Sequence, residues 1–290
     1  MTVEAQARDS FSLRDLASPL EHLRSLREAA QYFFKHRELL YELTKRELRD
    51  RYAGQVLGVF WALAHPLILV CTYLVIFVFV FRVRFPEGQA MPRDYATYIL
   101  AGVIPWLTFS EVMNRSCVSV VSNRDLVKQV VFPIEILPIR SVLASLVFFA
   151  ITMLALIVYS IARFGNLPAT FGLVIPLAFF QVIAMSGVGL ILAGLGSYFR
   201  DTKDLVQVFS LVGPYLIPAF FLPQWVPDAL KPIIYMNPFS YLVWCYQDAC
   251  YFGSIQHPIA WIVFPSLSVL IFSVGFMSFR RLKYAFGNFL

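Results

Sequence analysis

The chain has 290 residues, of which 59% are hydrophobic and only 14% charged, and its mean hydropathy is +0.67. A soluble protein of this length is about half apolar, so the composition excludes a soluble globular protein and predicts an integral membrane protein. The net charge of +6 would favour a nucleic-acid partner in a soluble chain, but here Lys and Arg lie between apolar segments, where they indicate topology, and no nucleic acid is expected.

The N-terminal part is expected to lie on the membrane surface. Residues 1–30 are predicted to be a cytoplasmic segment, with a short helix that begins at the Ser18 and Pro19 capping motif. Residues 31–56 place charged side chains on one helical face and apolar ones on the other, and an apolar span follows without a loop. This order predicts an amphipathic interfacial helix. A solvated helix of a soluble domain is the alternative, and the adjoining span disfavours it.

The remainder, residues 57–290, predicts an all-α membrane protein with six transmembrane helices, because a span needs about 20 apolar residues. The predicted spans are residues 57–81, 95–121, 139–162, 171–195, 205–222 and 259–279. Residues 223–258 mix aromatic residues with prolines, which predicts re-entrant gate helices between spans five and six. Nineteen of the 24 Lys and Arg residues lie on one side, so both termini are expected in the cytoplasm.

Motifs for chemistry are missing from the sequence. No GxxxxGK[ST] phosphate-binding loop occurs, so the chain is not expected to be an enzyme that hydrolyses ATP, and no catalytic, cofactor or metal-ligand pattern is predicted. One intramembrane polar pair, Glu111 and Arg115, is spaced i,i+4 and is interpreted as a structural ion pair, with gating as the alternative. A self-contained secondary transporter is a rival reading, but no repeated halves are found.

Aromatic residues make up 16% of the chain. The apolar faces of sugar rings stack on aromatic rings, so this composition favours a carbohydrate substrate. For any single ring, an ordinary membrane-interface belt is the alternative. The residues expected along the substrate path are Trp61, Tyr73, Trp106, Tyr215, Phe220, Tyr241 and Trp244.

Several short blocks occur in a defined order from Tyr32 onward. They are RYAGQVLGVFW at 51–61 with HPL at 65–67, LAGVIPW at 100–106, the segment 123–138 with FPIEILP at its end, YFRD at 198–201 and MNPF at 236–239. In this order the chain resembles the transmembrane permease of type-2 ABC exporters, which move lipid-linked polysaccharides such as O-antigen and teichoic acid.

The resemblance implies a homodimer that pairs with two copies of a cytoplasmic ABC ATPase, which binds ATP and Mg. The substrate would be an undecaprenyl-linked polysaccharide, O-antigen first, carried across the bacterial inner membrane, and teichoic acid or capsule polysaccharide is the alternative. Membrane lipids are the other expected partner. The resemblance also implies that the interfacial helix and the loop after span two contact the ATPase. The coupling residues expected there are Lys45, Arg46, Arg49, Arg124, Asp125 and Lys128.

Overall fold

The computed structural model describes residues 19–51, 54, 58, 60–80, 91–128 and 132–283. Every regular element in these ranges is helical, which confirms the predicted all-α class. Five helical segments are long and apolar enough to cross a membrane, so the chain is a multi-pass membrane protein. They are Phe60–Phe77, Tyr95–Ser119, Ile136–Phe164, Phe171–Tyr198 and Pro258–Leu282.

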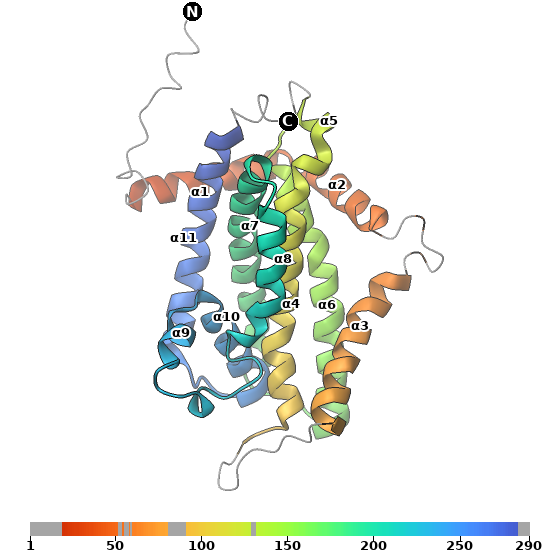
Figure 1. The fold of residues 1–290 in the computed structure, drawn as a ribbon, viewed down its shortest axis with the longest axis vertical. Helices are drawn as coiled ribbons and strands as arrows, with labels where there is room; N and C mark the ends of the chain where they lie inside the picture. Colours follow the sequence, from red (N-terminus) through yellow and green to blue (C-terminus); the bar gives the residue numbers. More distant parts are fainter. Residues whose placement is uncertain are drawn as a thin grey trace, which may run out of the picture.

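Four long helices lie side by side in the bundle: α4 (Tyr95–Ser119), α6 (Ile136–Phe164), α7 (Val174–Tyr198) and α11 (Pro258–Leu282) (Figure 1). Helix α4 is the central one and packs against α6, α7 and α8. Within its apolar span, 83% of the residues are buried inside the chain. A helix that is buried on all sides needs no polar face, which explains why the sequence of α4 is apolar around most of its circumference.

Glycines allow close contact between α7 and α11. A Cβ atom added to Gly187 of α7 would lie 2.5 Å from the backbone N of Phe272 in α11, and one added to Gly275 of α11 would meet the Gly187 carbonyl. The two backbones therefore touch directly, and a side chain at either position would force the helices apart.

Helices α1 (Pro19–Lys35) and α2 (Arg37–Asp50) cross one end of the bundle, where α5 (Arg124–Val127) also lies (Figure 1). We call this the charged end, and the opposite end the far end. Leu40 and Leu43 are the buried side chains of α2, which packs against α6. The break expected near residue 30, between the short N-terminal helix and the interfacial helix, lies instead at His36, where α1 and α2 meet.

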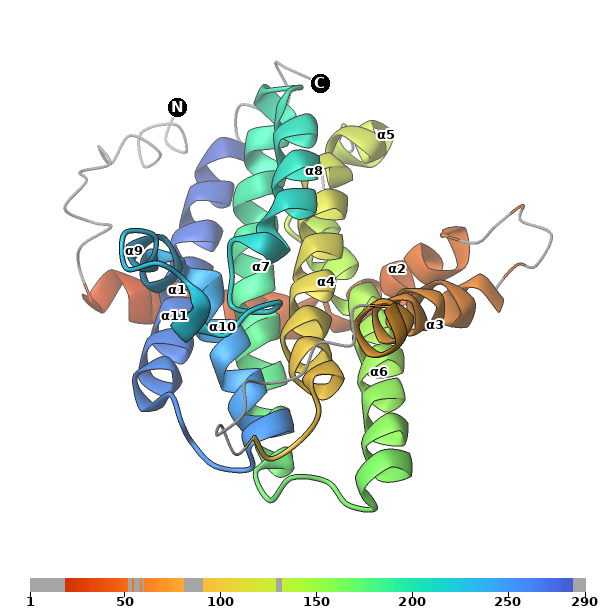
Figure 2. The same ribbon diagram turned by 60° about the horizontal axis from the view of Figure 1, so that its bottom comes forward.

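Helix α3 (Phe60–Leu74) and the π-helix η3 (Val75–Val80) that follows it stand at the edge of the bundle (Figures 1 and 2). Only 11% of the residues in this apolar span are buried inside the chain, and its contacts are mainly with α6. Residues 57 and 81, the predicted limits of the first span, lie outside the described residues, as do residues 1–17.

The predicted fifth span, residues 205–222, is not one continuous helix. Helix α8 (Thr202–Val212) has 11 residues, about 16 Å of length, whereas the hydrocarbon core of a bilayer is about 30 Å thick. The 3-10 turn η6 (Gly213–Tyr215) follows it. Pro214 and Pro218 lack the backbone N–H that a longer helix needs. The chain therefore descends along α4 for about half a bilayer and then turns away.

Two short helices follow at the far end, in the segment where gate helices are expected: α9 (Lys231–Met236) and α10 (Pro238–Gln247). Asn237 separates them, and its side-chain oxygen accepts a hydrogen bond from the Phe239 N–H, which caps α10. Helix α10 packs against α4 and α11 and continues into the π-helix η8 (Asp248–Phe252). Its role as a gate stays a prediction.

Candidate functional site

A pocket of about 660 Å³ opens between α3, α4 and α6, toward the charged end. One side of its wall is aromatic and apolar, and the other carries charged side chains. The lining residues are Arg51, Trp61, His65, Leu69, Leu107, Ser110, Glu111, Arg115 and Phe148. Pockets of this size bind small molecules or parts of larger ones, so we refer to it as the charged pocket.

Five charged side chains meet beside the charged pocket, and we call them the arginine cluster. Arg51 Nη1 lies 2.6 Å from Glu111 Oε1, and Arg115 Nε lies 3.1 Å from the same oxygen. Glu47 lies 3.3 Å from Arg140 Nε and 3.9 Å from Arg51 Nε. Three arginines against two glutamates leave an excess of one positive charge, which suits an acidic ligand.

Three helices bring the arginine cluster together. Arg51 is the C-cap residue of α2, a position where a cation is favoured by the helix dipole. Its side chain is only 3% exposed and also donates to Ser145 Oγ of α6 at 3.3 Å. A charged group this deeply buried is stable only if it is paired. Within the described ranges, no group of three or more His, Cys, Asp or Glu side chains is placed to hold a metal ion.

The predicted polar pair, Glu111 and Arg115, forms the α4 part of this cluster, and its role in gating stays a prediction. Sequence reasoning missed Glu47, Arg51 and Arg140 because they come from other helices. The sequence does carry one indication for Arg51. This residue lies at the junction between the charged helix and the apolar span, where a cation needs an acidic partner, and the nearest acid in the sequence is Asp50.

Four of the seven expected path residues lie at or near accessible surface, one at the charged pocket and three together elsewhere. Trp61 lines the charged pocket. Phe220 lies between the other two, with ring centroids 5.8 Å from Tyr73 and 5.3 Å from Tyr215. Tyr215 is 69% exposed. These four rings are thus accessible or adjacent to accessible surface, and their contact with a substrate stays a prediction.

The other three expected path residues lie deeper. Trp106 is fully buried and packs edge-on against Phe239. Tyr241 and Trp244 are neighbours on α10, with ring centroids 5.4 Å apart, and Trp244 is only 3% exposed. In this single chain Trp106 and Trp244 thus contact protein, and nothing further tests their place on a path.

The expected coupling residues are all exposed at the charged end. The loop after span two carries a helix, α5, which has four residues and follows the 3-10 turn η4 (Val121–Asn123). Residues 129–131 lie outside the described residues. The exposed side chains are Lys45, Arg46 and Arg49 of α2, Arg124 and Asp125 of α5, and Lys128 next to it. Their contact with an ATPase stays a prediction.

A buried carboxylate anchors the N-terminal helix at the charged end. Glu135 is fully buried and accepts hydrogen bonds from Tyr32 Oη of α1 at 2.7 Å and from Lys283 Nζ at 2.5 Å. Burial alone would raise the pKa of Glu135, but the hydrogen bonds from Lys283 and Tyr32 outweigh burial and hold the pKa below its ordinary value. Burial, and then the bond to Glu135, raise the pKa of Tyr32, which therefore stays a neutral donor.

A second buried carboxylate lies at the far end. Asp248 is fully buried and accepts three hydrogen bonds, from the His257 backbone N at 3.0 Å, from His257 Nδ1 at 2.8 Å and from Trp261 Nε1 at 3.0 Å. We call these three residues the Asp248 network. Sequence reasoning missed it, although Asp248 is the one acid between residues 229 and 290. An isolated acid in an apolar stretch is a signal for a functional site.

Comparisons with known proteins relate most of the chain to one family. The sequence model of the ABC-2 type transporter matches residues 38–251. The O-antigen export system permease protein RfbA of Klebsiella pneumoniae is 28% identical over 257 residues, 87% of this chain and 95% of that protein. The protein of the same name from Myxococcus xanthus is 27% identical over 232 residues, 79% and 85% of the two chains. The polysialic acid transport protein KpsM of Escherichia coli is 24% identical over 245 residues, 81% and 90%.

Proposed function

Because the family match extends over residues 38–251, the chain belongs to the ABC-2 type transporter family, and we propose that it is the permease of an exporter for a lipid-linked polysaccharide. O-antigen is the favoured cargo, because the relatives from Klebsiella pneumoniae and Myxococcus xanthus are O-antigen export permeases. A capsular polysaccharide is the second candidate, favoured by the polysialic acid transport relative. Teichoic acid is a third, without a relative to favour it.

The charged pocket is the observation that carries this proposal. A lipid-linked glycan joins a hydrocarbon chain to sugars through an acidic phosphate linkage, so its binding site needs cations next to apolar surface. Arg51 and Arg115 line the charged pocket together with Trp61. Guanidinium groups bind phosphate oxygens through two parallel hydrogen bonds. Arg115, whose side chain is 40% exposed, is the cation within reach of a ligand.

Helix α3 gives such a lipid a way to reach the charged pocket. Trp61 and His65 line the pocket from one face of α3, while Leu63 and Ile68 on its other faces are 44% and 55% exposed. The hydrocarbon chain can therefore stay in the bilayer beside α3 while the acidic linkage lies against the arginine cluster. We infer that the lipid-linked glycan enters beside α3.

A separate ATPase, which binds ATP and Mg, is proposed to drive transport, since the chain has no nucleotide-binding motif. The exposed charged side chains of α2 and α5 are the proposed docking surface. The positive-inside rule favours a cytoplasmic charged end, with both termini on that side, in the inner membrane. We expect two copies of the chain, because the irregular backbone after α8 at membrane depth needs protein or a wet cavity against it.

The test is export in cells that lack this chain. Lipid-linked glycan should accumulate inside these cells, and the wild-type chain should restore glycan at the cell surface. The double change Arg51→Gln and Arg115→Gln should lower surface glycan about tenfold, since a charge-assisted contact contributes about 1.5–3 kcal/mol. Arg163→Gln, at an exposed position at the far end of α6, is the control and should export normally.

Normal export by the double variant would overturn the role of the charged pocket, and normal surface glycan without the chain would overturn the proposed function.

A second test concerns the ATPase. The purified chain alone should hydrolyse no ATP, and ATP hydrolysis should appear only when the proposed ATPase subunit is added. Hydrolysis by the isolated chain would contradict the proposal that a separate subunit hydrolyses ATP.

A further inference from the structure

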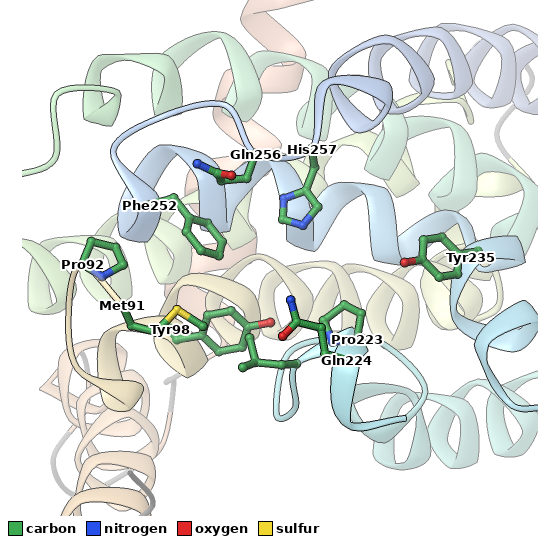
Figure 3. Close-up of a pocket in the computed structure, with 10 residues that line it drawn as sticks. Met91, Pro92, Tyr98, Pro223, Gln224, Tyr235, Phe252, Gln256 and His257 are labelled. Carbon is green, nitrogen blue, oxygen red and sulfur yellow. The ribbon is translucent and has the colours of Figure 1, made fainter. Parts of the chain in front are cut away.

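A second pocket, of about 670 Å³, opens at the far end of the molecule. It is remote in the fold from the charged pocket, and the two pockets have no described lining residue in common. Figure 3 shows the His257 ring directed into this cavity, with Phe252 on one side and Gln224 and Tyr98 opposite. We call it the far pocket.

The Asp248 network fixes the chemistry that His257 presents. A carboxylate only accepts hydrogen bonds, so the 2.8 Å contact with Asp248 Oδ1 places the proton on Nδ1 of the imidazole. The other nitrogen, Nε2, is then an acceptor when the ring is neutral, and no hydrogen bond joins it to another described residue. Trp244 stacks on the same ring at 5.4 Å with an angle of 8° between the planes. The ring is therefore held from two sides, with one nitrogen left for a ligand.

The rest of the lining indicates the class of ligand. Among the described residues that line the far pocket, none is Lys, Arg, Asp or Glu, so these residues supply no fixed charge to bind an ionic group. Amide groups from Gln224 and Gln256 supply donors and acceptors, and the rings of Phe252 and Tyr235 supply apolar faces. Planar polar groups beside aromatic rings match the alternating hydroxyl and C–H surfaces of a sugar.

We propose that the far pocket is a carbohydrate-binding site that holds a neutral segment of the exported glycan as it leaves the protein. His257 is its hydrogen-bonding centre, and Phe252 is its stacking surface. Asp248 and Trp244 are positioning residues, which act through the His257 ring. This inference rests on the proposed polysaccharide export. It also changes the expectation for Trp244, which would act on the glycan through the His257 ring and not by direct contact.

Two substitutions test the proposal directly. His257→Asn keeps an N–H near the Nδ1 position for Asp248 but has no group in place of Nε2. Phe252→Leu keeps much of the bulk but removes the ring. The control is Lys231→Gln, because Lys231 pairs with Asp228 at the surface of the far end and is not among the residues that line the far pocket. All three variants should unfold at the wild-type temperature.

The measurement is saturation-transfer NMR on the full chain in lipid nanodiscs. The probe is the glycan that mild acid releases from the lipid-linked polysaccharide of the source cell. We expect saturable transfer to the sugar protons for the wild type, binding weaker by about tenfold for His257→Asn and for Phe252→Leu, and a change below about twofold for Lys231→Gln. Absent binding by the wild type, or equal binding by all four proteins, would overturn the proposal.

A parallel measurement of surface glycan separates the two proposals. If the glycan fails to bind while export still depends on the chain, the far pocket is not a sugar site and the proposed function stands. If export does not depend on the chain but the two variants lose binding, the far pocket remains a sugar site and the proposed function falls.

Discussion

The arginine cluster at the charged end and the Asp248 network at the far end hold their carboxylates in different ways. In the arginine cluster, Glu47 and Glu111 each lie within 4.0 Å of more than one arginine, at distances from 2.6 to 4.0 Å. In the Asp248 network, one carboxylate accepts three hydrogen bonds of 2.8 to 3.0 Å from two residues. The first arrangement offers alternative partners, and the second offers none.

This difference matches what each end has to do under the proposed function. A site that receives an acidic ligand must release part of its internal pairing, which is possible where each glutamate has a second arginine nearby. A site that presents one imidazole nitrogen must keep its geometry, which is possible where every donor is directed at one buried acceptor. Exchangeable ion pairs therefore suit the charged pocket, and fixed hydrogen bonds suit the far pocket.

The largest effect is expected for Asp248→Ala. The partly buried donors of His257 and Trp261 would lose their shared acceptor, so the free energy of unfolding should fall by about 3 kcal/mol. Denaturant unfolding of the purified chain in detergent measures this loss. Asp228→Ala is the control at the same end, because Asp228 is 93% exposed and pairs with Lys231 at the surface, and it should unfold like the wild type. Equal stability of both variants would contradict the fixed network.

Charge reversal on α5 tests the charged end as the docking surface. The double change Arg124→Glu and Lys128→Glu removes two exposed cations, so export should fall about tenfold, equal to roughly 1.4 kcal/mol, while ATP hydrolysis by the complex continues. Surface glycan and phosphate release are measured together. Lys231→Gln at the far end is the control and should change neither. Full coupling in the double variant would place the contact on α2 instead.

A smaller loss is expected for Glu111→Gln, although it also removes a half-buried charge. Arg51 can turn to Glu47, 3.9 Å away, so the free energy of unfolding should fall by only about 1 kcal/mol. A double-mutant cycle with Arg51→Gln isolates the coupling between the two side chains. A loss as large as that of Asp248→Ala would show that the arginine cluster is as fixed as the far end.

The smallest effect concerns acid. Because the pKa of Glu135 is lowered in the folded chain, its stabilising effect is complete above the unfolded value of about 4.3 and is lost as the pH falls through the folded pKa. Docking of α1 should thus be constant between about pH 7 and 5 and weaken below about pH 4. Hydrogen exchange in α1 measures it. Glu135→Gln should show no such acid step, and an acid step retained in this variant would exclude Glu135 as its source.

The sequence predicts the apolar spans well, because hydropathy and length report directly on whether a helix can be buried in a membrane. It fails at α8, where residues 205–222 stay apolar across the break, so a hydropathy average does not register Pro214 and Pro218. The Asp248 network depends on the turn at Gly253, whose φ of 70° reverses the chain and returns His257 to Asp248. The arginine cluster joins positions such as Arg51 and Glu111, 60 residues apart, which no local pattern can relate.

The glycine contact between Gly187 and Gly275 has a mechanical consequence. The backbones of α7 and α11 touch at these two glycines, and a shift of either helix along the other would bring larger side chains into this contact. The two helices are therefore expected to move as one rigid unit. Helix α3 contacts the bundle along one side only, and α8 spans about half of its depth. These two helices are therefore held less firmly than α7 and α11. Under the proposed docking of an ATPase at α5, a movement of the ATPase would displace α3 and α8 relative to α7 and α11. The opening beside α3 would then widen or narrow with each ATPase cycle.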